Sequence, residues 1–405
     1  MGRSVPVIML LMVVATRAAF TGAFSDAPPR GAAQTIAAAP EGGWTFPYTD
    51  PRAIHREGVV YFGYIRGSDG SVVIAAHDEA AGTTDETVLS SALEVDDHDH
   101  PALLIRESDQ RIMAFWTKHG DTAVRYKVST NPLDISAFGA ERTVTSLITG
   151  TYTYAIPVEH GGVLRLFSRV TASGDNETQM SVSSDDGATW ATAVRLHDLT
   201  YTKVAVGDRV HILASDHPSG GQTSIYHFTL DADGTRRKSD GSVISASLPL
   251  QGSDMTVAYD GSMTRAWIWD AALDGQYPVA AFATFPGNDG SDHRARVARW
   301  DGSAWSSSEV AAMGTTIHTT DIPQAEPFYS GGVAIDRDEP DITYVSRKVG
   351  AHWLLYRYPG AVLLSASTGK ITRPAAVQSP GRMRVLAMSG TYDGYLDYEV
   401  ATVGG

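Results

Sequence analysis

The sequence predicts an all-β chain folded as a β-propeller of seven blades, with six blades as the alternative. Three observations support this prediction. Short apolar runs alternate with Gly- and Asp-containing turns from residue 41 to residue 402, and the chain of 405 residues holds 39 glycines. The runs recur as a repeat of roughly 50 residues and about four strands, which favours a propeller. One segment also carries the complete pattern S-x-D-x-G-x-T-W, which is typical of propeller turns.

Five spans each hold two strand-like runs around a tight turn, and successive spans start roughly 45–80 residues apart. We expect each span to be a β-hairpin of one blade. Their turns fall at residues 107–110, 160–162, 206–208, 259–261 and 336–338. The spans are Pro101–His119, Tyr154–Arg169, Lys203–His217, Met255–Asp270 and Val333–Arg347.

The complete pattern, Ser183–Trp190, is an Asp box. We expect its Ser and Asp to cap the turn between the outer strands of a blade, and its Trp to pack between blades. Arg299–Trp305 is a degenerate relative of the box. The box is structural and does not identify a chemistry.

The first residues differ from the rest of the chain. An apolar run, Val5–Ala15, follows Arg3, and small residues come after it. The run is too short to span a bilayer and fits a secretory signal peptide. We therefore expect a signal peptide at residues 1–25, a flexible lead-in at 26–40, one propeller domain at 41–405, and a secreted or periplasmic location.

The composition limits the partners more than it limits the chemistry. The formal net charge is −14 and the sequence has no cysteine. An acidic surface argues against nucleic acid and anionic membrane as general partners. A chain of this length can build a core without disulfides, so the lack of cysteine does not identify the compartment.

Ionisable and aromatic residues recur at one topological position of the predicted blades. In a propeller, the start of the innermost strand and the end of the next strand lie on the same face. Loops at one end of a rigid scaffold are where sites usually lie. The residues expected on this face are His98, His100, His119, Tyr152, Tyr154, Arg169, Tyr201, His217, His293, Arg294 and Arg347.

The strand ends of this face carry cations or potential cations: His119, Arg169, His217 and Arg347. On an acidic protein they suggest a positive pocket for a carboxylate or sulfate ligand. The alternative is that each simply faces water. The segment 96–101 could also bind a metal through Asp and His, but its spacing matches no zinc signature.

Acidic residues are scarcer at these positions, with Asp96, Asp97 and Asp270 available. The paired carboxylates of a glycosidase are therefore a less natural interpretation.

Several segments resemble the BNR-4-type propeller proteins over about residues 45–400. The segment 96–103 resembles the family's "DDHNxPAL" signature, and 154–158 followed by 166–169 resembles its "YxYPV…LFxR" hairpin. Further similar segments are Phe115–Gly120, Ser224–His227, Ala298–Gly302 and Ser389–Tyr398.

Characterised members of this family include propeller-type ulvan lyases and lyases that cut rhamnose–glucuronate linkages. The resemblance implies β-elimination at a 4-linked uronic acid, in which an arginine and a histidine neutralise the C6 carboxylate. A His or Tyr base removes the C5 proton, and a Tyr or His acid protonates the leaving oxygen. His98, His119, Tyr154 and Arg169 match the family's residues. The sequence departs from the family's motifs in two places. Tyr152 is therefore the alternative to Tyr154, and His100 is a residue that could share or replace a role in this chemistry.

The sequence therefore predicts a polysaccharide lyase acting on ulvan-like or rhamnose–glucuronate glycans. A propeller glycoside hydrolase of sialidase or rhamnosidase type and a non-catalytic glycan-binding propeller are the alternatives. The chemistry implied by the resemblance needs no cofactor. The family can hold a structural cation such as Ca²⁺, whose ligands the sequence does not identify. We expect an acidic polysaccharide as partner and a monomeric protein.

Overall fold

The computed structural model describes residues 34–35, 43, 47–318, 326–365, 369–389 and 401–404, and every structural statement below concerns these residues. The signal peptide predicted at residues 1–25 lies outside them, as does the predicted lead-in except for residues 34–35. So does most of the family-like segment at 389–398. A compact unit spans residues 32–405.

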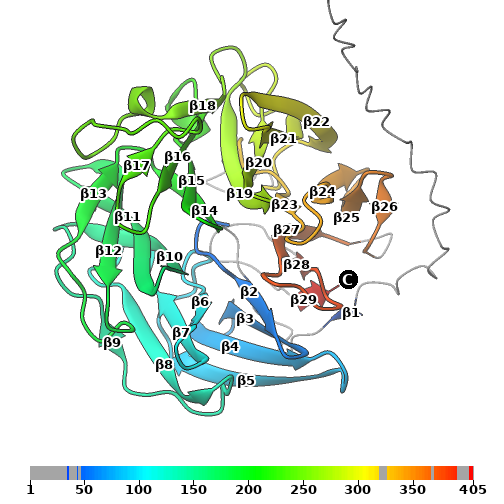
Figure 1. The fold of residues 1–405 in the computed structure, drawn as a ribbon. Helices are drawn as coiled ribbons and strands as arrows, with labels where there is room; N and C mark the ends of the chain where they lie inside the picture. The colour runs from blue at the N-terminus through cyan, green and yellow to red at the C-terminus, as the bar shows by residue number, and fades with distance from the viewer. Residues whose placement is uncertain are drawn as a thin grey trace, which may run out of the picture. The chain divides into compact units, whose positions relative to one another are not determined.

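Six antiparallel sheets of four consecutive strands follow one another in chain order around a common centre (Figure 1). In each sheet the strands pair in sequence order, from the centre outwards. The first three blades comprise β2 Ala53–Arg56, β3 Val59–Arg66, β4 Ser71–Asp78 and β5 Thr83–Ser90; β6 Ala102–Ile105, β7 Arg111–Trp116, β8 Arg125–Pro132 and β9 Arg142–Thr143; and β10 Thr151–His160, β11 Val163–Ala172, β12 Asp175–Ser183 and β13 Val194–His197.

The next three blades continue the ring, and one of them has an extra strand, β18, that pairs with β16. They comprise β14 Tyr201–Val206, β15 Val210–Ser215, β16 Ile225–Leu230, β17 Arg236–Arg237 and β18 Thr256–Tyr259; β19 Ala266–Asp274, β20 Tyr277–Thr284, β21 His293–Trp300 and β22 Trp305–Gly314; and β23 Val333–Ile335, β24 Thr343–Val349, β25 His352–Tyr358 and β26 Val362–Leu363.

A seventh sheet joins the two ends of the described chain, in the order β1-β29-β28-β27. It lies beside the first blade, and backbone bonds between His55 and Gln378 and between Gln378 and Ala53 link the two. Its strands are β1 Gln34–Thr35, β27 Ile371–Ala376, β28 Val385–Ser389 and β29 Ala401–Gly404.

The prediction of an all-β propeller is confirmed. The six blades made of consecutive strands correspond to the predicted alternative of six, and the seventh sheet is assembled differently because its strands come from both ends of the chain. The helical elements among the described residues are two short 3-10 turns, η1 Pro218–Gly220 and η2 Gly252–Asp254. Within the described residues, no helix has the length and hydrophobicity needed to cross a bilayer.

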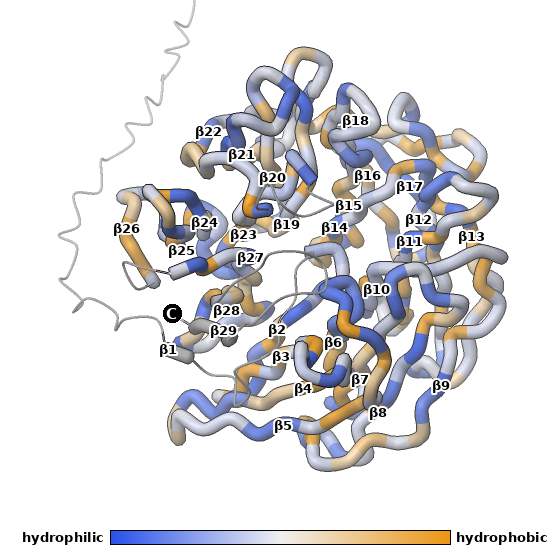
Figure 2. The backbone as a smooth tube through the Cα atoms, turned by 180° about the vertical axis from the view of Figure 1, so that it is seen from behind, coloured by the Kyte–Doolittle hydropathy of each residue, from blue (hydrophilic) through white to orange (hydrophobic). Residues whose placement is uncertain are grey.

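The burial of the strands follows their place in a blade. The second strand of the first blade, β3, is buried at six of its eight residues, whereas the outermost strand, β5, is buried at one. Strands covered by neighbouring blades on both faces need near-continuous apolar runs. Hydrophobic stretches accordingly recur along the strands, with hydrophilic stretches in the turns and loops (Figure 2).

The hairpin prediction is correct for four spans and wrong for Met255–Asp270. There, β18 pairs with β16 of the preceding blade, and β19 begins the next blade. The turn-like Gly261 is held against the preceding blade, because its N–H donates to Ser224 Oγ at 2.9 Å. A Cβ at Gly261 would lie only 1.7 Å from the carbonyl oxygen of Thr223, so only glycine fits this close approach.

The Asp box forms as predicted between β12 and β13. The hydroxyl and backbone N–H of Thr189 both donate to the carboxylate of Asp185, and Gly187 N–H donates to Ser183 Oγ at 2.9 Å. Trp190 is 6% exposed and lies edge-on to Phe115 of the preceding blade, with ring centroids 6.0 Å apart. The box therefore fixes a turn and the packing of one blade on the next.

Candidate active site

The return of the β6–β7 hairpin brings two histidines together. His98 lies in the loop before β6, and His119 follows β7. Their rings are stacked, with centroids 3.7 Å apart and planes inclined by 9°. His98 is buried, whereas 41% of the His119 side chain is exposed.

Asp96 connects the two imidazoles. One carboxylate oxygen accepts from His98 Nδ1, and the other lies 3.3 Å from His119 Nδ1. Burial alone would lower the pKa of His98, but the carboxylates of Asp97 and Asp96 outweigh it and raise that pKa to about 8. Burial opposes ionisation of Asp96 as well, yet His98 and His119 hold its pKa far below the usual range. The result is a His98 imidazolium held by neighbouring carboxylates near neutral pH.

The rest of this loop is closed to solvent. Asp99 and His100 are both 0% exposed. Burial, together with the neighbouring Asp96 and Glu94, raises the pKa of Asp99 to about 11, so this carboxyl stays protonated near neutral pH. His98 of this loop stacks on His119 and lies 5.5 Å from Tyr154, centroid to centroid.

Tyr154 comes to the histidines from the next blade. Its ring centroid lies 5.5 Å from that of His98, and the residue is 3% exposed. A β-bulge in β10 spans this position, between Thr153 and Ile156, and Tyr154 has φ +64. A bulky residue in the left-handed region is strained, and such strain clusters at functional sites.

Arg169, on β11, covers the ring of Tyr154, with its guanidinium carbon 4.6 Å from the ring centroid. Burial raises the pKa of Tyr154 well above its ordinary value, and Arg169 offsets this only in part. Arg169 donates to Thr153 Oγ1 at 3.1 Å, and its buried Nε has no hydrogen-bond partner. Among the described residues, no carboxylate forms an ion pair with Arg169, which leaves a cation available to an anionic ligand.

The bulge also separates Tyr154 from Tyr152. The Tyr152 hydroxyl donates to the carbonyl oxygen of Ile148 at 2.6 Å, and its ring packs in a different apolar cluster with Phe115 and Leu166. The structure thus places Tyr154, and not Tyr152, beside His98 and Arg169.

Tyr201 and His217 extend the cluster into the fourth blade. Tyr201 lies 5.9 Å from both Tyr154 and His217, centroid to centroid. Burial, reinforced by Arg169, lowers the pKa of His217 to about 4, so this imidazole is neutral near neutral pH. Its Nε2 lies 3.9 Å from a carboxylate oxygen of Glu326.

Three predicted binding residues do not join this cluster, because each has other partners. His293 is 0% exposed and bonds the carbonyl oxygen of Pro327 at 2.8 Å. Arg294 is paired with Asp292 and Glu309. Arg347, on β24, donates to the hydroxyl of Tyr358, on β25 of the same blade.

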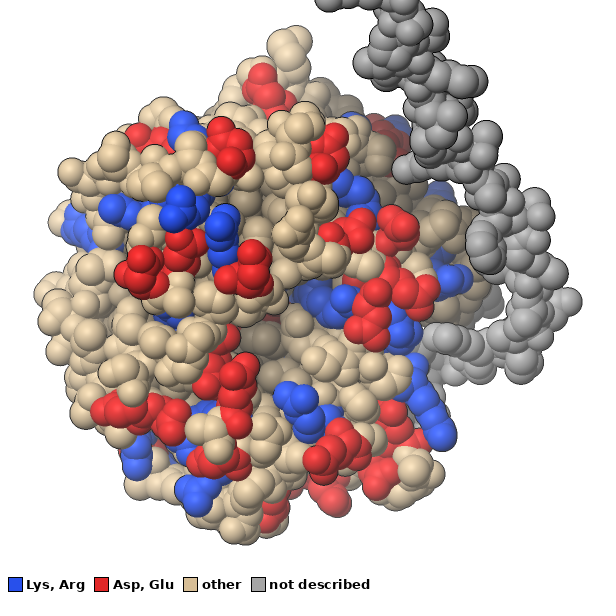
Figure 3. Space-filling model, in the orientation of Figure 1, with Lys and Arg blue, Asp and Glu red and all other residues tan. Residues whose placement is uncertain are grey.

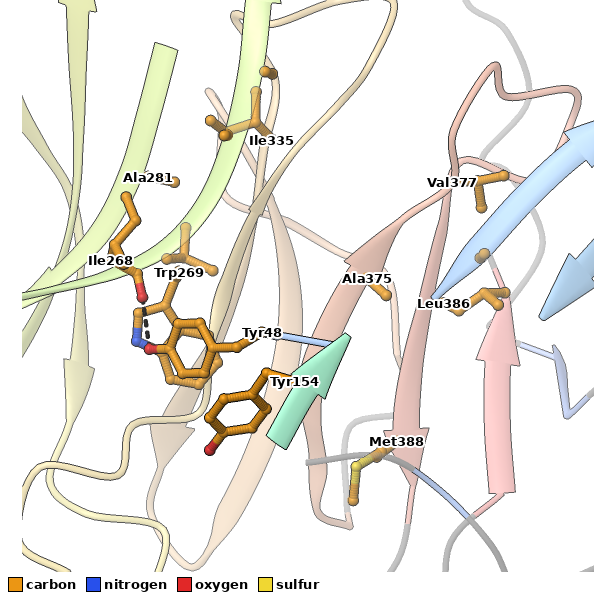
Figure 4. Close-up of a cluster of buried hydrophobic side chains, with 14 of the residues drawn as sticks. Tyr48, Tyr154, Ile268, Trp269, Ala281, Ile335, Ala375, Val377, Leu386 and Met388 are labelled. Atoms are coloured by element: carbon orange, nitrogen blue, oxygen red, sulfur yellow. Dashed lines mark hydrogen bonds between the residues drawn. The ribbon is translucent and has the colours of Figure 1, made fainter. Parts of the chain in front are cut away.

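The cluster also contains Tyr48 and Trp267, which the strand-end pattern does not predict. Tyr48 precedes the first blade, and its ring lies 5.3 Å from Tyr154 and 4.4 Å from Tyr201. Its hydroxyl donates to the carbonyl oxygen of Ile268 at 2.7 Å (Figure 4). Trp267 lies 4.5 Å from the His217 ring. No motif marks Tyr48, whereas the apolar run of β19 is the one signal for Trp267.

Within the part of the chain that the structure describes, Asp96, His98 and His119 form a group that could hold a metal ion. Ligand atoms of Asp96, His98 and His119 all lie within 4.8 Å of one another. Two imidazole nitrogens and one carboxylate oxygen suit a transition metal better than Ca²⁺, which prefers oxygen ligands. The structural Ca²⁺ remains a prediction.

Comparisons with solved structures show the same fold. An ulvan lyase described as a new family of polysaccharide lyase, PL25, bound to -[GlcA(1-4)Rha3S]-, matches with a TM-score of 0.60 and 15% identity, covering 92% of this chain and 94% of that chain. A second structure of a PL25 ulvan lyase matches with a TM-score of 0.61 and 16% identity, covering 89% and 93%. The polysaccharide lyase Uly1 matches with a TM-score of 0.56 and 11% identity, covering 89% and 91%.

A search of curated proteins finds no match to the chain. The model of the BNR repeat-containing family matches residues 59–313, which is more than half of the chain. The chain therefore belongs to the BNR repeat-containing family.

Proposed function

We propose that this protein is a polysaccharide lyase that cleaves a uronic-acid-containing glycan by β-elimination. The observation that carries the proposal is the placement of Arg169, without a carboxylate partner among the described residues, over Tyr154 and beside the His98–His119 pair. This arrangement supplies a cation for a uronate and proton-transferring groups within one cluster. The likeness to ulvan lyases supports the choice of glycan, with glucuronate or iduronate next to rhamnose.

Arg169 and the imidazolium of His98 neutralise the C6 carboxylate of the substrate. Neutralising this charge stabilises the negative charge that develops when the C5 proton leaves. Such preorganised electrostatic stabilisation is usually the largest contribution to a step of this kind.

Two groups remain for proton transfer. His119, the exposed member of the histidine pair, removes the C5 proton. The double bond between C4 and C5 forms as the bond from C4 to O4 breaks, and O4 takes the proton of Tyr154. The raised pKa of Tyr154 keeps its hydroxyl protonated in the free protein, which supports its role as proton donor.

The acids of the site favour elimination over hydrolysis by paired carboxylates. Asp96 and Asp97 both contact His98 Nδ1. Asp270 is 1% exposed and is held by Arg337 at 2.7 Å. These carboxylates already serve buried cations, so none is placed as a general acid beside an open cleft.

The proposal is tested by incubating the protein with ulvan, rhamnose–glucuronate gums and other uronans, and following ultraviolet absorbance of the 4,5-unsaturated uronate. Tyr154→Phe should abolish the rise in absorbance. Tyr152→Phe is the matched control and should keep it, because its hydroxyl only contacts the backbone of Ile148. No absorbance on any uronan would overturn the proposal, and glycan binding without turnover would favour a binding module.

A further inference from the structure

A second group of buried polar side chains lies in a cavity between the blade β14–β17 and the blade β19–β22. The cavity has a volume of about 220 Å³, and its lining includes His211 of β15 and Thr229 of β16. These two residues lie directly opposite each other in the β15–β16 register.

The cavity lies at the other end of the β14–β15 hairpin from the candidate active site. Tyr201 pairs with Ser215 at one end of this hairpin, and Ala205 pairs with His211 next to its turn. The cavity is therefore separate from the cluster around Tyr154.

Both His211 and Thr229 hold a buried polar atom that lacks a partner in the described part of the chain. These atoms are Nε2 of His211 and Oγ1 of Thr229. The residues are 6% and 3% exposed, respectively. Buried polar groups are nearly always hydrogen-bonded, so two neighbouring unpaired atoms on one cavity mark a place where a ligand or a water would supply the missing partners.

A chain of hydrogen bonds links His211 to Trp305 and leaves Nε2 of His211 for a ligand. Trp305 Nε1, which can only donate, lies 2.9 Å from Ser239 Oγ, and Ser239 Oγ lies 2.8 Å from His227 Nδ1. When the serine hydroxyl donates to His227 Nδ1, His227 Nε2 donates to His211 Nδ1 at 3.2 Å, and the hydrogen of His211 lies on Nε2. When His227 Nδ1 instead donates to the serine oxygen, His211 Nδ1 donates to His227 Nε2, and His211 Nε2 is an acceptor.

Burial keeps both imidazoles neutral, which this chain requires. It lowers the pKa of His211 to about 4. It also lowers the pKa of His227 well below the usual value, with a further contribution from His211. Each ring therefore carries one N–H near neutral pH.

Aromatic rings form part of the cavity wall. Trp300 and Tyr277 both line it, and Tyr277 is 36% exposed. Gly302, in the turn of the degenerate box, has φ +97, and a Cβ there would come within 3.0 Å of Tyr277 Oη. The glycine thus allows the tyrosine ring to lie against this turn.

The charges around the cavity cancel. Arg209 and Lys238 line it together with Asp208 and Asp240. A wall with two cations and two carboxylates does not select a strong anion. Aromatic surface with a few convergent polar groups is instead the make-up of a site for a small polar ligand.

We propose that this cavity binds a neutral sugar residue of a polysaccharide, as an accessory site that takes no part in the elimination. His211 Nε2 forms a hydrogen bond with one sugar hydroxyl, the Thr229 hydroxyl bonds a second one, and the Tyr277 ring contacts the apolar face of the sugar. Only the choice of polymer rests on the proposed function.

The test is ligand-observed saturation-transfer NMR with the methyl glycosides of rhamnose, xylose and glucose, and of glucuronate as the charged comparison. At least one neutral glycoside should receive saturation from the wild type and from Tyr154→Phe. Tyr277→Ala and Thr229→Val should reduce this transfer to baseline. Met263→Ala, at a position 83% exposed, is the control and should leave it unchanged.

Transfer to no neutral glycoside would mean that the cavity holds only water, and transfer unaffected by Tyr277→Ala and Thr229→Val would place binding elsewhere. Either result overturns the proposal. Because this measurement needs no turnover, it tests sugar binding in the cavity even if the lyase assay shows no activity. Thr229→Val removes an unpaired hydroxyl, so urea unfolding should show that the variant stays folded.

Discussion

Two buried ionic clusters lie within the ring of blades, and they differ in how their charges are matched. In the first, Lys203 lies 2.9 Å from a carboxylate oxygen of Asp50, and Arg337 holds both carboxylate oxygens of Asp270 at 2.7 and 2.9 Å. In the second, Arg169 has a hydroxyl and an aromatic ring as partners and no carboxylate among the described residues.

The difference separates a structural cluster from a candidate active site. Buried charges paired by carboxylates hold the inner strands together, and removing one partner leaves the other uncompensated. Arg169 has no such carboxylate partner among the described residues and lies next to a strained tyrosine and a histidine pair, so it is available to bind a ligand. On the face seen in Figure 3, acidic and basic side chains lie around a hollow at the centre of the ring, so surface charge alone does not distinguish the two clusters.

The largest expected effect is on stability, from Arg337→Ala. This change leaves the buried Asp270 without the cation that binds both of its oxygens, so the free energy of unfolding should fall by about 3–5 kcal/mol, as measured by urea unfolding. The matched control is Arg195→Ala. The Arg195 side chain, which pairs with Glu177, is 43% exposed, so its loss should lower the free energy of unfolding by about 1 kcal/mol or less. An equal loss in both variants would contradict the distinction between the clusters.

Arg169→Ala should act in the opposite way. Turnover should fall by about 10²–10³-fold, because the variant loses one electrostatic contact to the developing charge. The free energy of unfolding should change by about 1 kcal/mol or less, since no buried carboxylate loses its partner. Initial rates and urea unfolding on the same preparation check both parts. A large loss of stability with unchanged turnover of the folded protein would reverse the assignment.

The carboxylates around His98 should make stability depend on pH. Its folded pKa of about 8 lies above the ordinary imidazole value of ~6.5. The stabilisation is therefore fully present below about pH 6.5 and is lost as pH rises through about 8, by about 2 kcal/mol. Urea unfolding between pH 6 and 9 measures this loss, and Asp97→Asn should reduce it. An identical pH dependence in wild type and Asp97→Asn would show that the carboxylate does not hold the imidazolium.

The smallest expected effect concerns Thr153, which positions Arg169. Its Oγ1 accepts from Arg169 Nη2 and from Gly120 N–H, both at 3.1 Å. Thr153→Ala should reduce the stabilisation of the transition state by about 0.5–1.5 kcal/mol. This loss would appear as a few-fold fall in kcat with little change in KM. Thr153→Ser keeps the hydroxyl and should restore the rate. Equal rates in the Ala and Ser variants would show that this contact does not position the arginine.

Local sequence was enough to predict the pairs that a single hairpin joins. His98 with His119, and Tyr154 with Arg169, lie at the open ends of the β6–β7 and β10–β11 hairpins, so strand return alone brings each pair together. The Asp box was predictable for the same reason, because its bonds join residues at most four apart in the chain.

The failures have equally local causes that the sequence pattern did not reveal. The hairpin expected at 255–270 does not form, because β18 finds its hydrogen-bond partners on β16. Arg294 and Arg347 were expected on the binding face, yet nearby partners within their blades hold them. A strand-end position predicts where the backbone of a residue lies, but it does not predict which partner the side chain binds.

The sequence by itself determined the all-β propeller, the Asp box and the pairing of candidate residues within hairpins, because these depend on short-range periodicity and turns. The tertiary structure decided which tyrosine faces the histidines, through a bulge that places Tyr154 at φ +64. It also decided that Tyr48 packs against Tyr154, and that Asp270 is matched by Arg337 while Arg169 is left to a ligand. These contacts join blades that are far apart along the chain, so only the closure of the ring brings them about.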